Sequence, residues 1–146
     1  MKTYNQIGIK TLFFVFAIAI LSNCKKNKDM DFLLQNEWKV KSIYTGEKTL
    51  KAPSKNFREE AYILKFINNT MFYLHTSVNY AGGRYNIVSE GNINIKNYGS
   101  HTLVCCENDF DEQMMNTMNR VSNYYCKGNK LTFLTDKNEK IFFEKQ

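Results

Sequence analysis

Residues 105–125 read CCENDFDEQMMNTMNRVSNYY and contain the amphipathic helix around which the chain is organised. Four apolar residues recur at intervals of four, four and three, which places them on one face of a helix with 3.6 residues per turn. They are Phe110, Met114, Met118 and Val121. Asn108 or Asp109 can cap the first backbone amides. The spacing predicts a helix over residues 109–122, with its methionines filling a core.

The sequence around this helix predicts short antiparallel strands, because apolar and polar residues alternate between turn-forming residues. The strands fall at residues 38–42, 62–66, 71–76, 93–95, 101–106, 130–134 and 140–144, and a further strand after the helix ends near Lys127. Trp38, Val40 and Ser42 share one face, and the charged stretch 46–60 reads as a surface loop. So many strands would expose edges unless the sheet curls. We expect a mainly β (α+β) fold, a small bent antiparallel sheet or barrel with the helix packed at its end.

The N-terminus has the pattern of a bacterial lipoprotein signal. Lys2 and Lys10 precede the apolar run 11–21, which is too short to span a bilayer but suits a secretory signal. The sequence Leu-Ser-Asn-Cys that ends at Cys24 resembles a lipobox, in which the cysteine is acylated after cleavage. An uncleaved anchor with an incidental cysteine is the alternative. We expect a signal peptide at 1–23, a polar tether at 24–31 and one domain at 32–146.

An acylated Cys24 would hold the protein on a membrane, because two or more acyl chains give stable attachment. No Asp follows Cys24, which favours the outer membrane of a Gram-negative bacterium, on its periplasmic or its exterior side. Removal of residues 1–23 deletes two lysines and no acid, so the net charge of +6 falls to +4. This moderate basic excess suits an anionic surface and gives no reason to expect nucleic acid as a partner.

A set of residues spread over nearly the whole domain follows a recognisable order. It runs from an early Trp strand through Asn-x-x-x-Gly-x-Tyr, a Thr-x-x-x-Cys strand and an acidic helix start to a closing Gly-Asn-x-Leu hairpin. Its members are Trp38, Leu64, Phe66, Asn79, Gly83, Tyr85, Thr102, Cys106, Asp111, Met114, Met118, Val121, Tyr124, Gly128, Asn129, Leu131 and Phe133. This order resembles the META domain family, and within it the heat-inducible HslJ-type lipoproteins. Ser77 and Val78 depart from the Gly-Cys pair that the family often has there.

Three cysteines remain once Cys24 is lipidated, an odd number for an oxidising compartment. Cys105 and Cys106 are neighbours on an expected strand and point to opposite faces, so at most one of them can pair with Cys126. We expect a disulfide between Cys106 and Cys126 or between Cys105 and Cys126. Buried thiols are the alternative.

The resemblance implies a non-catalytic envelope lipoprotein that binds a partner or supports stress tolerance. A soft-metal site formed by His101 and the cysteines is disfavoured, because structural zinc sites normally use Cys-x-x-Cys pairs. A thiol nucleophile would need a neighbouring base, for which His75 and His101 are the candidates. We therefore expect no enzyme activity, cofactor or metal. The alternative is a periplasmic thiol-dependent enzyme or soft-metal carrier that uses Cys105, Cys106 and Cys126.

The expected binding face for an envelope protein partner is the turn region 79–85. There Tyr80 and Arg84 are predicted to be exposed beside two glycines. Under the alternative interpretation, Asn79, Gly83 and Tyr85 only build a bend, with the tyrosine packed beneath it.

Overall fold

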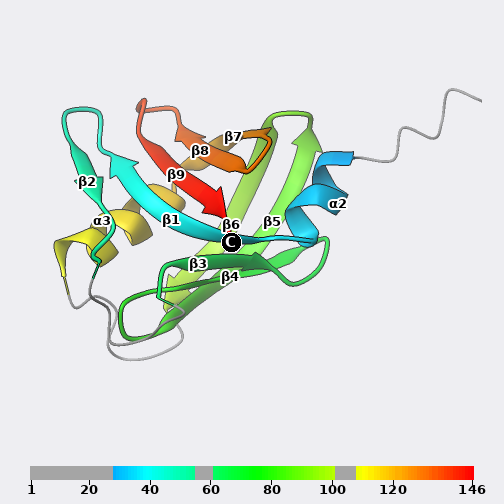
Figure 1. Ribbon diagram of the computed structural model, residues 1–146. Coiled ribbons are helices and arrows are strands. Elements are labelled where there is room, and N and C mark those ends of the chain that lie inside the picture. The colour runs from blue at the N-terminus through cyan, green and yellow to red at the C-terminus, as the bar shows by residue number, and fades with distance from the viewer. Residues whose placement is uncertain (1–27, 55–60, 101–107) are drawn as a thin grey trace, which may run out of the picture.

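The protein forms a closed antiparallel β-barrel in the computed structural model, which describes residues 28–54, 61–100 and 108–146 (Figure 1). The strands are β1 (Glu37–Tyr44), β2 (Thr49–Lys51), β3 (Ile63–Phe66), β4 (Met71–His75), β5 (Tyr80–Ser89), β6 (Asn92–Ser100), β7 (Val121–Lys127), β8 (Lys130–Thr135) and β9 (Lys140–Lys145). They follow the order β2-β1-β3-β4-β5-β6-β7-β8-β9, and β9 also pairs with β1. That last pairing closes the sheet and leaves the short β2 beside β1, which confirms the expected fold class.

A bulge in β1 allows this strand both to contribute buried residues to the core and to pair with β9, which closes the barrel. The pairing of β1 with β9 shifts register between Val40 and Ser42. The alternation of buried residues therefore passes from Trp38 and Val40 to Ile43, which is fully buried, while Ser42 is only half-buried. The prediction that Ser42 shares the inner face of Trp38 was wrong for this reason. An extra residue also bends the strand, as barrel closure requires.

Helix α3 (Asp109–Met118) closes one end of the barrel with the predicted apolar face. Met114 and Met118 are fully buried, and the Asn108 side chain caps the helix by accepting a hydrogen bond from the Asp111 amide at 2.9 Å. The predicted helix extended to residue 122, but the chain turns after Met118. Val121 instead begins β7 and pairs with β8. Strand pairing therefore takes precedence over helical spacing in these last four residues.

A second helix, α2 (Lys28–Leu34), packs on the barrel where the sequence predicted a tether up to residue 31. Leu33 is fully buried, and its carbonyl accepts a hydrogen bond from the Trp38 indole at 3.4 Å. Phe32 packs edge-on against Trp38, with ring centroids 5.6 Å apart. From Lys28 onward the expected tether is thus part of the folded domain. In Figure 1, α2 and α3 lie at opposite ends of the molecule.

The topology gives the barrel two distinct ends. The start of β1 lies at the α2 end, together with the β3–β4, β5–β6 and β7–β8 hairpins. Glu37 at the start of β1 pairs with Lys65 near the β3–β4 hairpin. The Lys145 amide donates a hydrogen bond to the Asn129 carbonyl in the β7–β8 hairpin at 2.8 Å. At the α3 end lie α3, the β4–β5 connection and the β8–β9 loop.

Strand β2 lies within the stretch 46–60 that was predicted as a loop.

No helix among residues 28–54, 61–100 and 108–146 has the length and apolarity that crossing a bilayer requires.

Candidate functional site

The outer faces of β4 and β5 form a shallow hollow, which we call the β4–β5 hollow. Pairing sets Met71 opposite Arg84 and Tyr73 opposite Gly82, on the face turned away from the core. Because Gly82 has no side chain, the surface is hollowed beside Tyr73. The hollow has a volume of about 290 Å³. Its outward lining includes Ile67, Met71, Tyr73, Tyr80, Gly82 and Arg84.

Aromatic and apolar side chains are concentrated on this face. The His75 ring lies 5.1 Å from that of Tyr73 and 6.4 Å from that of Tyr80, measured between centroids. Ile67, Met71 and Tyr80 are three of the five large hydrophobic side chains that are exposed in the described ranges. Exposed apolar groups gathered in one place mark binding surfaces more often than scattered ones do.

A pair of like charges lies at the rim of the β4–β5 hollow. Arg84 of β5 is directly opposite Lys96 of β6, and both side chains are exposed. Neither forms an ion pair with any residue that the structure describes. Like charges directly opposite each other in a sheet are destabilising. An anion bound between the two cations would relieve this repulsion.

Strand β6 pairs with β5 beside the hollow. Gly82 pairs with Gly99, so two glycines adjoin on the outer face. A Cβ atom added at Gly99 would meet no atom of the described residues within 4 Å. A larger residue can therefore be placed there, opposite Gly82 at the edge of the hollow, without a clash between its Cβ and a described residue.

The structure divides the predicted turn motif. Asn79 does lie in a tight connection, where its carbonyl accepts the Thr76 amide at 2.7 Å. Gly83 and Tyr85 instead lie within β5, so the prediction of a turn was wrong for both, since β5 continues its pairing with β4 and β6 there. Tyr85 is buried, its hydroxyl donates to the Asn68 carbonyl at 2.7 Å, and burial raises its pKa to about 12. Tyr85 is thus packed beneath the surface, as the alternative interpretation expected, but it lies in a strand and not in a bend.

Sequence reasoning found two residues of the hollow and missed the others. Tyr80 and Arg84 are exposed beside glycines, as predicted. Tyr73 and Met71 lie on a strand that was predicted. The hollow beside them forms only because Gly82 is paired with Tyr73, and the sequence alone does not reveal that pairing. Lys96 lies opposite Arg84 because the β5–β6 register shifts between Gly82 and Arg84, where residues 82–84 of β5 match residues 96–99 of β6. That shift has no signal in the sequence.

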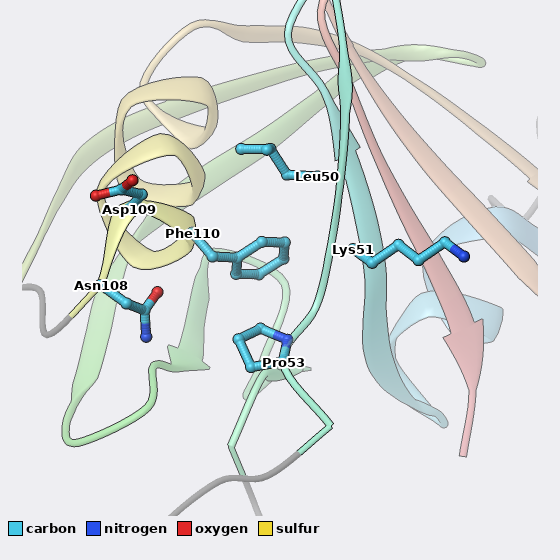
Figure 2. Close-up of a pocket in the computed structure, with 6 residues that line it drawn as sticks. All are labelled: Leu50, Lys51, Pro53, Asn108, Asp109 and Phe110. Atoms are coloured by element: carbon cyan, nitrogen blue, oxygen red, sulfur yellow. The ribbon is translucent and has the colours of Figure 1, made fainter.

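A second cavity, of about 590 Å³, lies at the α3 end between β2 and the start of α3. Figure 2 shows Phe110 reaching from α3 toward Pro53, with Leu50 above it and the Lys51 side chain directed away. The cavity adjoins the points at which the described chain stops, at Ser54 and before Asn108. It therefore gives a weaker basis for a site than the β4–β5 hollow, which lies on two strands that the structure describes.

A buried polar cluster joins α3 to the β4–β5 connection. Asp111 is fully buried, and its carboxylate accepts hydrogen bonds from the Ser77 hydroxyl and, at 3.4 Å, from the Ser77 amide. Asn108 donates to the Tyr62 hydroxyl at 3.3 Å, and burial raises the pKa of Tyr62 to about 12. Ser77, at the departure from the family pattern, thus supplies partners that a buried carboxylate needs. Asp111 and Ser77 are buried, and their hydrogen bonds tie α3 to the β4–β5 connection.

The remaining predicted sites lie wholly or partly outside the described residues. Cys126 is half-buried in β7 and packs against the core, whereas Cys24, Cys105 and Cys106 are not described. The disulfide from Cys126 to Cys105 or Cys106 therefore stays a prediction, as does the strand at residues 101–106. Among the residues that are described, no three His, Cys, Asp or Glu side chains gather as metal ligands would.

Solved structures share this fold at low sequence identity. The chain resembles the NMR structure of a protein from Burkholderia xenovorans, with a TM-score of 0.61, 12% identity and coverage of 82% of this chain and 87% of that one. It also resembles the crystal structure of a DUF4847 family protein from Bacteroides vulgatus, with a TM-score of 0.58, 13% identity and coverage of 80% and 96%. No curated protein matches the sequence. The META domain model matches residues 31–146, most of the chain, and the protein therefore belongs to the META domain family.

Proposed function

We propose that the protein is a lipid-anchored module of the Gram-negative cell envelope, attached to the outer membrane through Cys24, that binds an acidic sugar without catalysing a reaction. One observation carries the ligand class. The like-charged pair of Arg84 and Lys96 adjoins a hollow flanked by Tyr73 and Tyr80. The lipobox-like sequence before Cys24 supports the anchor.

The chemistry of the hollow suits a sugar ring that carries a carboxylate or phosphate. The C–H faces of a sugar pack against aromatic rings, while the phenol hydroxyls of tyrosine can bond to its hydroxyls. The planar guanidinium of Arg84 can bind a carboxylate through two parallel hydrogen bonds, and Lys96 adds a second positive charge. A volume of about 290 Å³ is at the lower limit for ligand pockets, which favours a short ligand.

The binding experiment uses the full-length protein purified in detergent from bacterial membranes. It is titrated calorimetrically with a hyaluronan tetrasaccharide as the acidic probe and with chitotetraose as the neutral one. We expect the acidic sugar to bind more tightly, and we expect Arg84→Gln and Gly99→Val to weaken that binding at least tenfold. The first variant removes a cation, and the second adds bulk opposite Gly82, at the edge of the hollow.

Matched variants separate binding from general surface effects. Tyr80→Ala is compared with Tyr125→Ala, since both side chains are about half exposed, at 47% and 59%. Arg84→Gln is compared with Lys48→Gln, an exposed cation in the turn between β1 and β2. Equal affinities for the site variants and their controls would refute the acidic-sugar proposal. Mass spectrometry of the Cys24 peptide tests the anchor separately, and an unmodified cysteine would refute it.

A further inference from the structure

The distance between the acyl anchor and the folded domain is short. Helix α2 begins at Lys28, four residues after Cys24, and Leu33 and Trp38 hold it on the barrel. A fully extended chain spans at most about 3.6 Å per residue, so the Cα atoms of Cys24 and Lys28 lie within about 14 Å of each other. The ten-residue strand β5 is roughly 33 Å long. The tether can therefore bring the α2 end to a membrane surface, but not the α3 end in its place.

Unpaired cations gather at the α2 end. Lys127 and Lys130 face each other across the β7–β8 turn. Lys145 lies beside the same turn, since its backbone amide donates a hydrogen bond to the Asn129 carbonyl. All three side chains are exposed and form no ion pair within the described ranges. The sequence adds Lys25, Lys26 and Lys28 beside the anchor. Clustered lysines next to a lipid anchor are attracted to anionic headgroups.

The acids at this end are fewer than the cations. Glu37 pairs with Lys65 at 2.6 Å and Glu144 with Lys41 at 3.3 Å, while Glu90 is exposed at the β5–β6 hairpin and Asp29 and Asp31 lie in α2. The α3 end differs, because exposed acids lie beside its lysines. Glu47, Asp109, Glu112 and Asp136 are the exposed acids there, and Lys48, Lys51 and Lys137 are the exposed lysines. The uncompensated positive charge therefore belongs to the α2 end.

Exposed apolar side chains lie at the tips of the same end. Val88 is 66% exposed beside the β5–β6 hairpin, and Ile67 is 54% exposed where β3 turns into β4. Apolar groups at exposed tips, next to lysines, have the arrangement of surfaces that enter the headgroup region of a bilayer.

We infer that the α2 end of the barrel rests on an anionic membrane surface, with Lys127, Lys130 and Lys145 at the lipid phosphates and Val88 and Ile67 among the headgroups. This inference rests on the acyl anchor at Cys24 proposed above. It places the cavity of Figure 2 on the side that faces away from the membrane. It also directs the Ile67 edge of the β4–β5 hollow toward the lipid, so that the hollow opens sideways just above the headgroups.

The test measures the depth of single tryptophans in the acylated full-length protein. The protein is reconstituted into vesicles of phosphatidylglycerol and phosphatidylethanolamine that carry brominated acyl chains, which quench nearby tryptophan. Val88→Trp reports on the α2 end, and Asn116→Trp, an exposed position of α3, is the control at the other end. Trp38 is fully buried and gives the same background in both variants. We expect quenching several-fold stronger for Val88→Trp.

A second variant tests the lysines. Lys127→Gln, Lys130→Gln and Lys145→Gln together should reduce the quenching of Val88→Trp in anionic vesicles and leave it unchanged in phosphatidylcholine. Equal quenching at both tryptophans, or stronger quenching at Asn116→Trp, would overturn the orientation. Mass spectrometry of the same samples keeps the two ideas apart. An unacylated Cys24 refutes the anchor, whereas an acylated protein with equal quenching refutes only the orientation.

Discussion

Replacing Leu33 with Ala tests whether α2 is an integral part of the domain. Leu33 is fully buried beneath the barrel end, where its neighbours Trp38 and Phe32 also pack. A Leu→Ala change in a core costs about 3 kcal/mol, from lost burial and the cavity left behind. A domain of this size loses roughly 4 °C of Tm per kcal/mol. We therefore expect Tm to fall by about 12 °C.

The assay is thermal unfolding followed by circular dichroism and by Trp38 fluorescence. Trp38 reports directly on α2, because its indole donates to the Leu33 carbonyl. Gln35→Ala is the matched control, since Gln35 follows the helix and is exposed. Its Tm should change by less than about 2 °C, as expected for a surface substitution of up to about 0.5 kcal/mol. A Leu33→Ala shift as small as that of the control would show that α2 contributes nothing to stability.

Three further predictions concern single groups. The Thr117 hydroxyl is buried without a hydrogen-bond partner among the described residues, so Thr117→Val should raise the free energy of unfolding by about 1 kcal/mol in urea titrations, and Thr117→Ser should not. The hydrogen bond from Arg120 holds the pKa of Glu139 below its ordinary 4.5, so this pair stabilises the fold above that pH and the contribution is lost as the pH falls through the lowered pKa. Glu139→Gln should cost about 1 kcal/mol at pH 7, after allowance for the partly exposed Arg120, and the difference from wild type should shrink below about pH 4. Gly128 has a φ of 58°, so Gly128→Ala should cost about 1 kcal/mol, whereas Gly99→Ala, whose Cβ would meet no atom of the described residues within 4 Å, should change stability far less.

The sequence was sufficient to predict the strands and helix whose side chains alternate strongly. Leu131 and Phe133 on β8, and Met114 and Met118 on α3, are buried as their spacing indicated. The order of motifs also identified the META domain family, which the family match confirms. For these strands and this helix, the spacing of apolar residues along the sequence indicated which face meets the core.

Elements that depend on long-range pairing could not be predicted. Strand β2 has three residues, too few for a period, and exists because Leu50 pairs with Ile43. Helix α2 is less than two full turns long and is held by Trp38, a contact that spacing cannot reveal. The β4–β5 hollow likewise depends on the register that sets Gly82 between Tyr73 and Gly99. Such features arise from tertiary packing and become visible only once the sheet is closed.

The seam between β1 and β9 has a consequence for the timing of folding. The two strands that complete the ring are more than ninety positions apart, since Trp38 pairs with Lys145. During synthesis β1 therefore keeps one edge bare until nearly the whole domain has left the ribosome, and non-local partners of this kind are slow to find each other. A nascent chain of this topology cannot close its barrel until its synthesis is nearly complete. For a polypeptide that must thread through a translocation channel before it folds, as the envelope location proposed above requires, that delay is an advantage.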